Sequence, residues 1–78
     1  MDTSNLPALP EIKPGRYRHY KGGEYEVLGV ARHSETLAAM VLYRPLYNDS
    51  GLWVRPYPMF FESVEVEGRR QPRFAAID

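Results

Sequence analysis

The chain has 78 residues, ten basic and ten acidic side chains, and no cysteine. This length suits one domain and excludes two, and the lack of cysteine excludes a disulfide framework and a cysteine-ligated zinc site. The formal net charge of zero disfavours a nonspecific nucleic-acid binder, although a local basic patch would still allow nucleic acid as a partner.

The N-terminal residues 1–13 are predicted to form an extended arm. Pro7, Pro10 and the following Pro14 prevent a regular helix, because proline lacks the backbone N–H and fixes φ. The first residues lack the basic start and apolar core of a signal peptide, and no apolar run approaches the about 20 residues that span a bilayer. We therefore expect a cytoplasmic protein with no membrane association.

Two strands joined by a tight turn are predicted next. The sequence GRYRHY at 15–20 alternates aromatic and basic side chains, and EYEVLGVAR at 24–32 is rich in β-branched and aromatic residues. The Lys-Gly-Gly segment between them supplies the positive φ of a hairpin, so the two strands should pair antiparallel. Gly29, inside the second strand, predicts a bulge or a bend.

A second pair of strands follows at 40–47 (MVLYRPLY) and 52–56 (LWVRP). The Asn-Asp-Ser-Gly sequence between them is a strong turn signal. Pro45 cannot donate to a sheet ladder, so it should lie at a sheet edge or near the end of its strand, and Pro56 should terminate the other strand. These features predict another antiparallel hairpin.

The remaining elements are short. Residues 59–62 are expected to form one helical turn, and SVEVE at 63–67 is expected to form a fifth strand. Residues 69–78 carry mixed charge and are expected to form an open C-terminal tail. The predicted fold is all-β: a curled antiparallel sheet or small barrel of about five strands, similar in size to an SH3 domain, over residues 14–68.

Four stretches of the chain resemble the bacterial family called domain of unknown function 1653. They read GRYRHYKGGEYEVLGVARHSETL, VLYRPLY, GLWVRP and MFFESVEVEG, and the resemblance spans about residues 14–74. It implies a β-barrel-like fold in a bacterial protein. It implies no established activity.

The sequence His-Ser-Glu-Thr after the second strand is the first candidate site. It contains a base, a hydroxyl and a carboxylate, but neighbours in sequence seldom assemble a catalytic geometry. Serine and threonine also bond the backbone in turns, so a structural turn is the leading interpretation and a ligand-contacting loop is the second. A hydrolase that uses His33 with Glu35 as its orienting group remains an alternative.

Trp53 and Arg55 form the second candidate site, because alternation places them on one face of their strand. Trp53 and Tyr43 are expected to fill the core, yet interleaved aromatic and arginine side chains also stack bases and pair phosphates. Arg55 must stack on a ring, pair with a carboxylate such as Glu62 or Glu26, or face a cleft.

Two further features of the sequence are weaker signals of function. His19 and His33 lack the further ligands that zinc requires, so no metal and no cofactor are expected. The apolar sequence Met-Phe-Phe at 59–61 is either a core plug or a partner patch.

Together these features favour a noncatalytic binding module for a small anionic or nucleotide-like ligand or a partner segment. A hydrolase and a structural interaction domain are the alternatives, and the partner's identity stays open. The candidate ligand-binding residues are His33, Ser34, Glu35, Thr36, Trp53 and Arg55.

Overall fold

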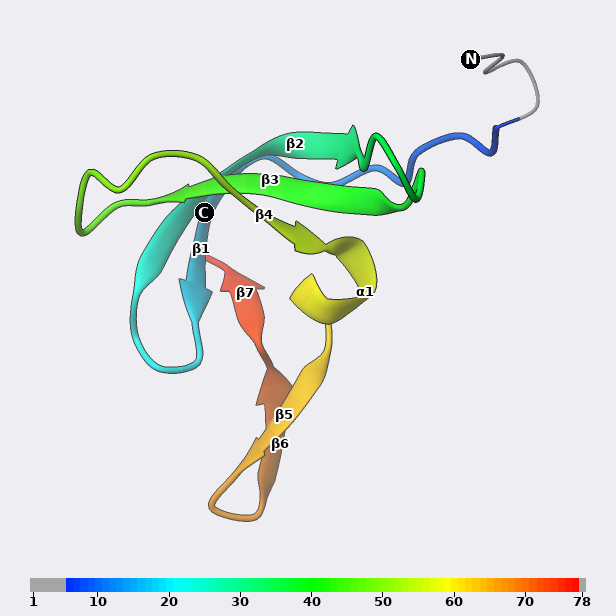
Figure 1. Cartoon of the computed structure of the whole chain (residues 1–78). Helices are drawn as coiled ribbons and strands as arrows, with labels where there is room; N and C mark the ends of the chain where they lie inside the picture. The colour runs from blue at the N-terminus through cyan, green and yellow to red at the C-terminus, as the bar shows by residue number, and fades with distance from the viewer. Residues whose placement is uncertain (1–5, 78) are drawn as a thin grey trace.

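The computed structural model describes residues 6–77, which fold mostly into β-strands with one short helix (Figure 1). Five strands form an antiparallel sheet in the order β4-β3-β2-β1-β7, and β5 and β6 form a separate two-stranded sheet. The elements in chain order are β1 (Gly15–His19), β2 (Glu24–Arg32), β3 (Ala39–Pro45), β4 (Trp53–Pro56), α1 (Tyr57–Phe60), β5 (Ser63–Val66), β6 (Arg69–Pro72) and β7 (Phe74–Ala76).

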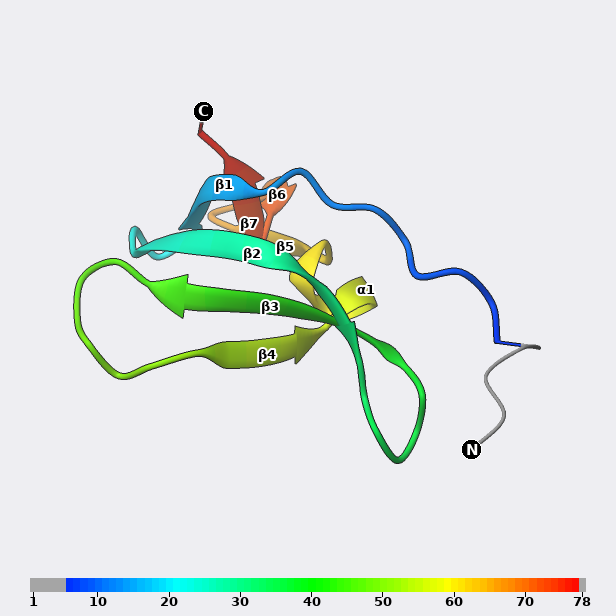
Figure 2. The same ribbon diagram turned by 90° about the horizontal axis from the view of Figure 1, so that it is seen from above.

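The all-β, curled antiparallel fold predicted from the sequence is confirmed, in its open form. The large sheet curls strongly but does not close, because β4 and β7 remain at its two edges (Figure 2). The curl is accompanied by a shift of register between β2 and β3, where Leu28 has no partner between the paired Val27 and Gly29. A bulge of this kind bends a strand and increases its twist, as Gly29 led us to expect.

The first hairpin forms as predicted. β1 pairs with β2 in antiparallel register, with Tyr17 opposite Tyr25, and Gly22 in the turn has a φ of 106°. The helical turn α1 begins at Tyr57, two residues earlier than expected. Pro58 lies in the first turn of this helix, where a missing N–H costs no hydrogen bond.

The core lies on the concave face of the sheet and is mainly aromatic. Phe60 of α1 is fully buried and confirms the core plug, whereas its neighbours Met59 and Phe61 are exposed. Phe60 stacks face to face on Phe74 of β7, with ring centroids 4.1 Å apart and an interplanar angle of 3°. The buried hydrophobic residues are Tyr17, Val27, Val41, Tyr43, Phe60 and Phe74.

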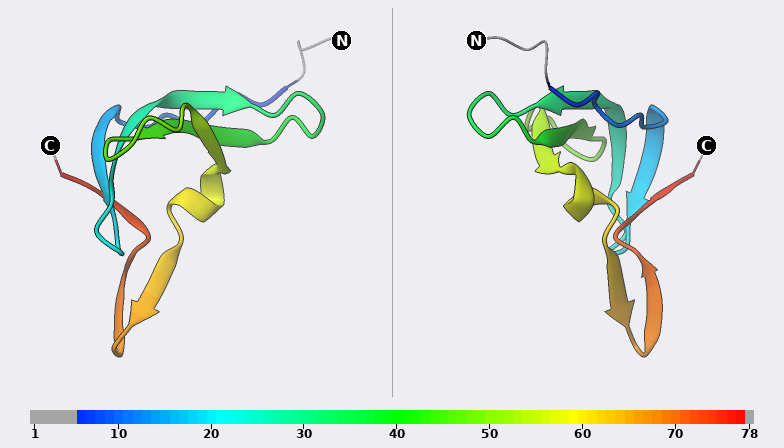
Figure 3. Two further views of the ribbon diagram at one scale, coloured as in Figure 1. Left: turned by 60° about the vertical axis from the view of Figure 1, so that its left-hand side comes forward. Right: turned by 90° about the vertical axis from the view of Figure 1, so that its right-hand side faces the viewer.

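The open tail expected after residue 68 is wrong for the part that the structure describes. β6 pairs with β5, and β7 pairs with β1 through Phe74 opposite His19. Two bonds to Glu62 fix the crossing between these sheets, from the Arg73 backbone N–H at 2.9 Å and from its guanidinium at 2.7 Å. Figure 3 shows the β5–β6 hairpin projecting away from the large sheet. No alternation marks β7 in the sequence, because this strand has three residues and a single buried aromatic.

The predicted arm has no regular secondary structure from residue 6 to residue 14. Ile12 packs against the core, and the Tyr17 hydroxyl donates a 2.8 Å hydrogen bond to the Lys13 carbonyl. The first five residues of the arm and residue 78 of the expected tail lie outside the described part of the chain.

The stacked phenylalanine pair yields a stability prediction. Phe74→Ala removes a ring that is 2% exposed and leaves a cavity beside Phe60, so we expect a loss of about 3–5 kcal/mol in the free energy of unfolding. Phe61→Ala, at a ring that is 41% exposed, is the matched control and should cost much less. Denaturant unfolding followed by circular dichroism compares them. Equal losses in the two variants would contradict the assigned role of Phe74.

Candidate functional site

His33 closes the turn between β2 and β3. Its imidazole Nδ1 accepts hydrogen bonds from the backbone N–H groups of Glu35 and Thr36, both at 3.1 Å. The backbone N–H of His33 donates to the Ala38 carbonyl, and the backbone carbonyl of His33 accepts from the Leu37 N–H, both at 2.8 Å. The histidine therefore satisfies backbone groups that a tight turn leaves without strand partners.

The same geometry bears on the hydrolase alternative, which needs a carboxylate to orient the histidine. Within residues 6–77 the Glu35 carboxylate makes no hydrogen bond or ion pair, and only its backbone N–H contacts His33. The Thr36 hydroxyl accepts a 3.3 Å hydrogen bond from the Ala38 N–H. The side chains of His33 and Thr36 thus bind backbone N–H groups of their own turn. The side-chain contact between His33 and Glu35 that the hydrolase needs does not form.

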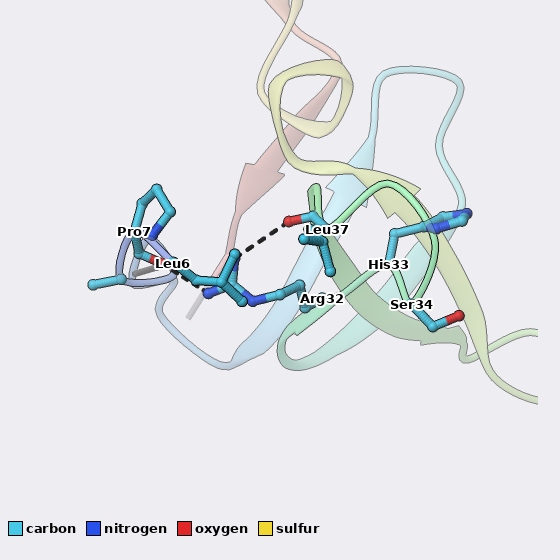
Figure 4. A pocket seen from close by; sticks show the side chains of 7 residues that line it. Leu6, Pro7, Arg32, His33, Ser34 and Leu37 are labelled. Carbon is cyan, nitrogen blue, oxygen red and sulfur yellow. Dashed lines mark hydrogen bonds between the residues drawn. The ribbon is translucent and has the colours of Figure 1, made fainter. Parts of the chain in front are cut away.

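A cleft of about 550 Å³ lies between this turn and the N-terminal arm (Figure 4). The Arg32 guanidinium joins its two sides, donating to the Pro7 carbonyl at 2.8 Å and to the Leu37 carbonyl at 3.3 Å. The lining residues are Leu6, Pro7, Ala8, Arg32, His33, Ser34 and Leu37. Sequence reasoning found His33 and Ser34 but missed Arg32, because nothing in the pattern indicated that the arm returns to this end of β2.

Trp53 and Arg55 lie on the concave face of β4, as alternation predicted. Trp53 is opposite Tyr43 and its ring is 6.3 Å from the Tyr43 ring, edge to face, yet it stays 40% exposed. Arg55 is half-buried, with its guanidinium carbon 5.6 Å from the centre of the Phe74 ring and its Nε donating to the Tyr43 hydroxyl at 3.4 Å. Arg55 therefore rests on aromatic groups.

The structure separates the six candidates into two groups. The turn at 33–36 follows Arg32, which pairs with Ala39 at the start of β3, whereas Trp53 pairs with Tyr43. At about 3.3 Å per residue, four residues along β3 place Trp53 roughly 13 Å from that end. Neither Trp53 nor Arg55 lines the cleft beside the turn. Ligand binding by either group stays a prediction.

The charges on the two faces of the sheet are arranged differently. On the outer face Glu24 pairs with Arg18 at 3.0 Å, and Glu26 pairs with Arg44 at 2.7 Å. On the concave face, Arg55 has no carboxylate within ion-pair distance among residues 6–77. Glu26, which the sequence offered as its partner, is held by Arg44.

His19 lies near three positively charged side chains. Burial lowers its pKa from the ordinary value of 6.5, and the charges of Arg55, Arg73 and Lys21 lower it further. Its ring contacts the Phe74 ring edge to face, with centroids 4.8 Å apart. Of the three cations, Arg73 is paired with Glu62 at 2.7 Å.

The described residues form neither a metal site nor a membrane-spanning helix. His19 and His33 lie beyond opposite ends of β2, so they do not form the metal pair considered from the sequence. No group of three histidine, cysteine, aspartate or glutamate residues within 6–77 is placed to hold a metal ion. In the same part of the chain, no helix has the length and apolarity needed to cross a membrane.

The lowered pKa of His19 gives a pH-dependent stability. The unfolded chain binds the His19 proton at a higher pH than the folded chain. The contribution of His19 to the free energy of unfolding is therefore complete above about pH 6.5. It should decrease as the pH falls from 6.5 through the folded-state pKa. His19→Asn keeps an acceptor for the Lys21 N–H and removes the titration. Denaturant unfolding should therefore show a shallower pH dependence in this variant, and identical profiles would refute the expectation.

The turn predicts a contrast between two substitutions of His33. His33→Ala removes the acceptor of two backbone N–H groups and should cost about 0.5–1.5 kcal/mol, with faster amide exchange at Glu35 and Thr36. His33→Asn should retain slow exchange at Glu35, because an asparagine oxygen accepts from the N–H two residues on. Amide exchange measured by NMR distinguishes the variants; exchange in His33→Ala as slow as in the wild type would show that the imidazole does not hold the turn.

Comparisons with known proteins now give the family. A family model described as a protein of unknown function, DUF1653, matches residues 15–76. The chain is similar to the crystal structure of a DUF1653 protein from Bordetella bronchiseptica, with 40% sequence identity and a TM-score of 0.80 over 90% of this chain and 92% of that chain. No curated protein matches it. The chain therefore belongs to the DUF1653 family of proteins of unknown function.

Proposed function

We propose that this protein is a noncatalytic binding module whose concave face holds a small anionic ligand of the nucleotide type. The observation that carries this proposal is Arg55, a half-buried guanidinium with no carboxylate partner among residues 6–77. Buried or partly buried arginine is usually paired, since its charge is costly to remove from water. A phosphate or carboxylate of a ligand would supply the missing partner.

The surrounding charges support an anion at this place. His19 lies in the field of Arg55, Arg73 and Lys21, and the charges that shift its pKa are all positive. The chain as a whole is neutral, so this field is local to the cations around His19. An anion on the concave face would be attracted even though the net charge offers no steering.

Trp53 supports the aromatic part of the ligand. It lies two residues from Arg55 on the same face of β4, a separation of about 6.6 Å along the strand. The indole is backed by Tyr43 and remains 40% exposed, so one surface is open to stack a base. In this arrangement Arg55 binds the phosphate and Trp53 binds the base, while the turn at 33–36 has a structural role.

Nucleotide titration tests the proposal directly, because Trp53 is the single tryptophan of the chain and its fluorescence reports on stacking. Adding AMP, GMP or UMP should change this fluorescence in a saturable way, and added salt should weaken the effect. Arg55→Gln should lower the affinity about tenfold or more, equivalent to roughly 1.4 kcal/mol.

The matched control is Arg44→Gln, which removes an arginine from the outer face, where Glu26 pairs with it. This variant should bind nucleotides as the wild type does. If millimolar nucleotide leaves the fluorescence unchanged, or if both arginine variants lose affinity equally, the concave face is not the site. Inorganic phosphate alone should bind more weakly, because it offers nothing to stack on Trp53.

A further inference from the structure

The cleft beside the turn combines apolar walls with one cation. Its volume of about 550 Å³ lies within the range of about 300–1,000 Å³ that is usual for sites of small molecules. The arm contributes Leu6, Pro7 and Ala8 to its walls, and the turn contributes Leu37. Arg32 is the cation, and none of the described residues that line the cleft is acidic.

The positive charge of Arg32 is not compensated within residues 6–77. Its guanidinium donates to the carbonyls of Pro7 and Leu37, which satisfy two of the five N–H groups of a guanidinium but carry no net charge. No carboxylate in this part of the chain lies within ion-pair distance of it. Arg32 is half-buried, and such a group is usually paired, because its charge is costly to remove from water. Its remaining N–H groups are therefore available to an anionic ligand.

Leu37 gives independent support, because its backbone has the left-handed conformation that leucine rarely adopts. Its φ of 66° costs a residue with a side chain roughly 1–2 kcal/mol, and a glycine would avoid this cost. The Leu37 side chain belongs neither to the buried core nor to the residues that pack against the core, yet it lines the cleft. Backbone strain at a position whose side chain lines a cleft is typical of binding sites.

These features select a class of ligand. A planar carboxylate matches the fork of N–H groups on a guanidinium, and one arginine compensates its single charge. The apolar walls favour a hydrocarbon group beside that carboxylate, because burying the group removes apolar surface from water. A phosphate with two charges would meet a single guanidinium here, since the His33 imidazole points away from Arg32 (Figure 4). A nucleotide base would find no phenylalanine, tyrosine or tryptophan ring among the described lining residues.

We propose that the cleft beside the turn binds a small monocarboxylate with an apolar tail, of the kind that a short fatty acid represents. Its carboxylate pairs with Arg32, and its tail lies against Leu6 and Leu37. The bound molecule thereby joins the arm to the turn. This site shares neither Trp53 nor Arg55 with the nucleotide site proposed above, so either proposal stands if the other fails.

The probe is hexanoate, titrated into the full-length chain and followed by NMR. We expect saturable shifts at Leu6, Arg32 and Leu37 at concentrations on the order of millimolar, as suits so small a ligand. Acetate keeps the carboxylate and lacks the tail, whereas hexanol keeps the tail and lacks the charge. Each of them should bind about tenfold more weakly than hexanoate, or less well still.

Two variants separate the ligand contacts from folding. Arg32→Gln removes the charge and should lower the affinity for hexanoate about tenfold or more. Leu37→Gly removes an apolar wall and should weaken binding several-fold. It should not lower the free energy of unfolding, because glycine adopts a φ of 66° without strain. Leu37→Gly therefore tests the site even if Arg32→Gln does not fold.

The matched control is Arg44→Gln, which removes an arginine that Glu26 pairs on the outer face and should bind hexanoate as the wild type does. Four results would overturn the proposal. The first is the absence of saturable shifts around the cleft, and the second is equal affinity for hexanoate and hexanol. The third is binding that persists in Arg32→Gln and disappears in Arg55→Gln, which would place the carboxylate on the concave face. The fourth is tighter binding of N-acetylleucine than of hexanoate, which would assign the cleft to the C-terminal carboxylate of a protein chain.

Discussion

The stack of Phe60 on Phe74 is the interaction on which the rest of the structure depends. The large sheet is open, so its concave face would be exposed to water unless something from outside β1 to β4 covered it. Phe60 comes from α1 and Phe74 from the last strand, and both contact Tyr43 at the centre of the sheet. In a chain of 78 residues without cysteine, such aromatic contacts carry most of the stabilisation.

The Phe74 ring also links the core to the candidate site. Phe74 contacts Phe60 on one side, and His19 and Arg55 also lie against it. A charged guanidinium on the face of a buried aromatic ring is favourable, yet this contact does not neutralise its charge. Core packing therefore holds the cation in place while leaving its charge available. On the outer face the arrangement is reversed, since carboxylates there neutralise the arginines and little packing holds them.

The sequence was sufficient for the elements with a clear pattern. Alternation over the nine residues of β2, the glycine turn before it and Gly29 near the bulge were all visible. β7 was missed because three residues with one buried aromatic form no period. The sequence analysis grouped the turn at 33–36 with Trp53 only because both have side chains that suit a ligand. The pairing register of β3 with β2 and β4 places the two parts at different positions along β3. Arg32 was missed because its partner Pro7 is 25 residues away.

The contacts that hold the arm have a consequence for how its sequence is constrained. Arg32, Tyr57 and Tyr17 donate to backbone carbonyls of the arm, a group that every residue carries. Among residues 6–13, Ile12 is the one that packs against the core. Substitutions elsewhere in the arm are tolerated to the extent that the chain stays extended, and the prolines provide that property. The hydrogen bonds that hold this segment therefore depend on its backbone shape and not on the identity of its side chains.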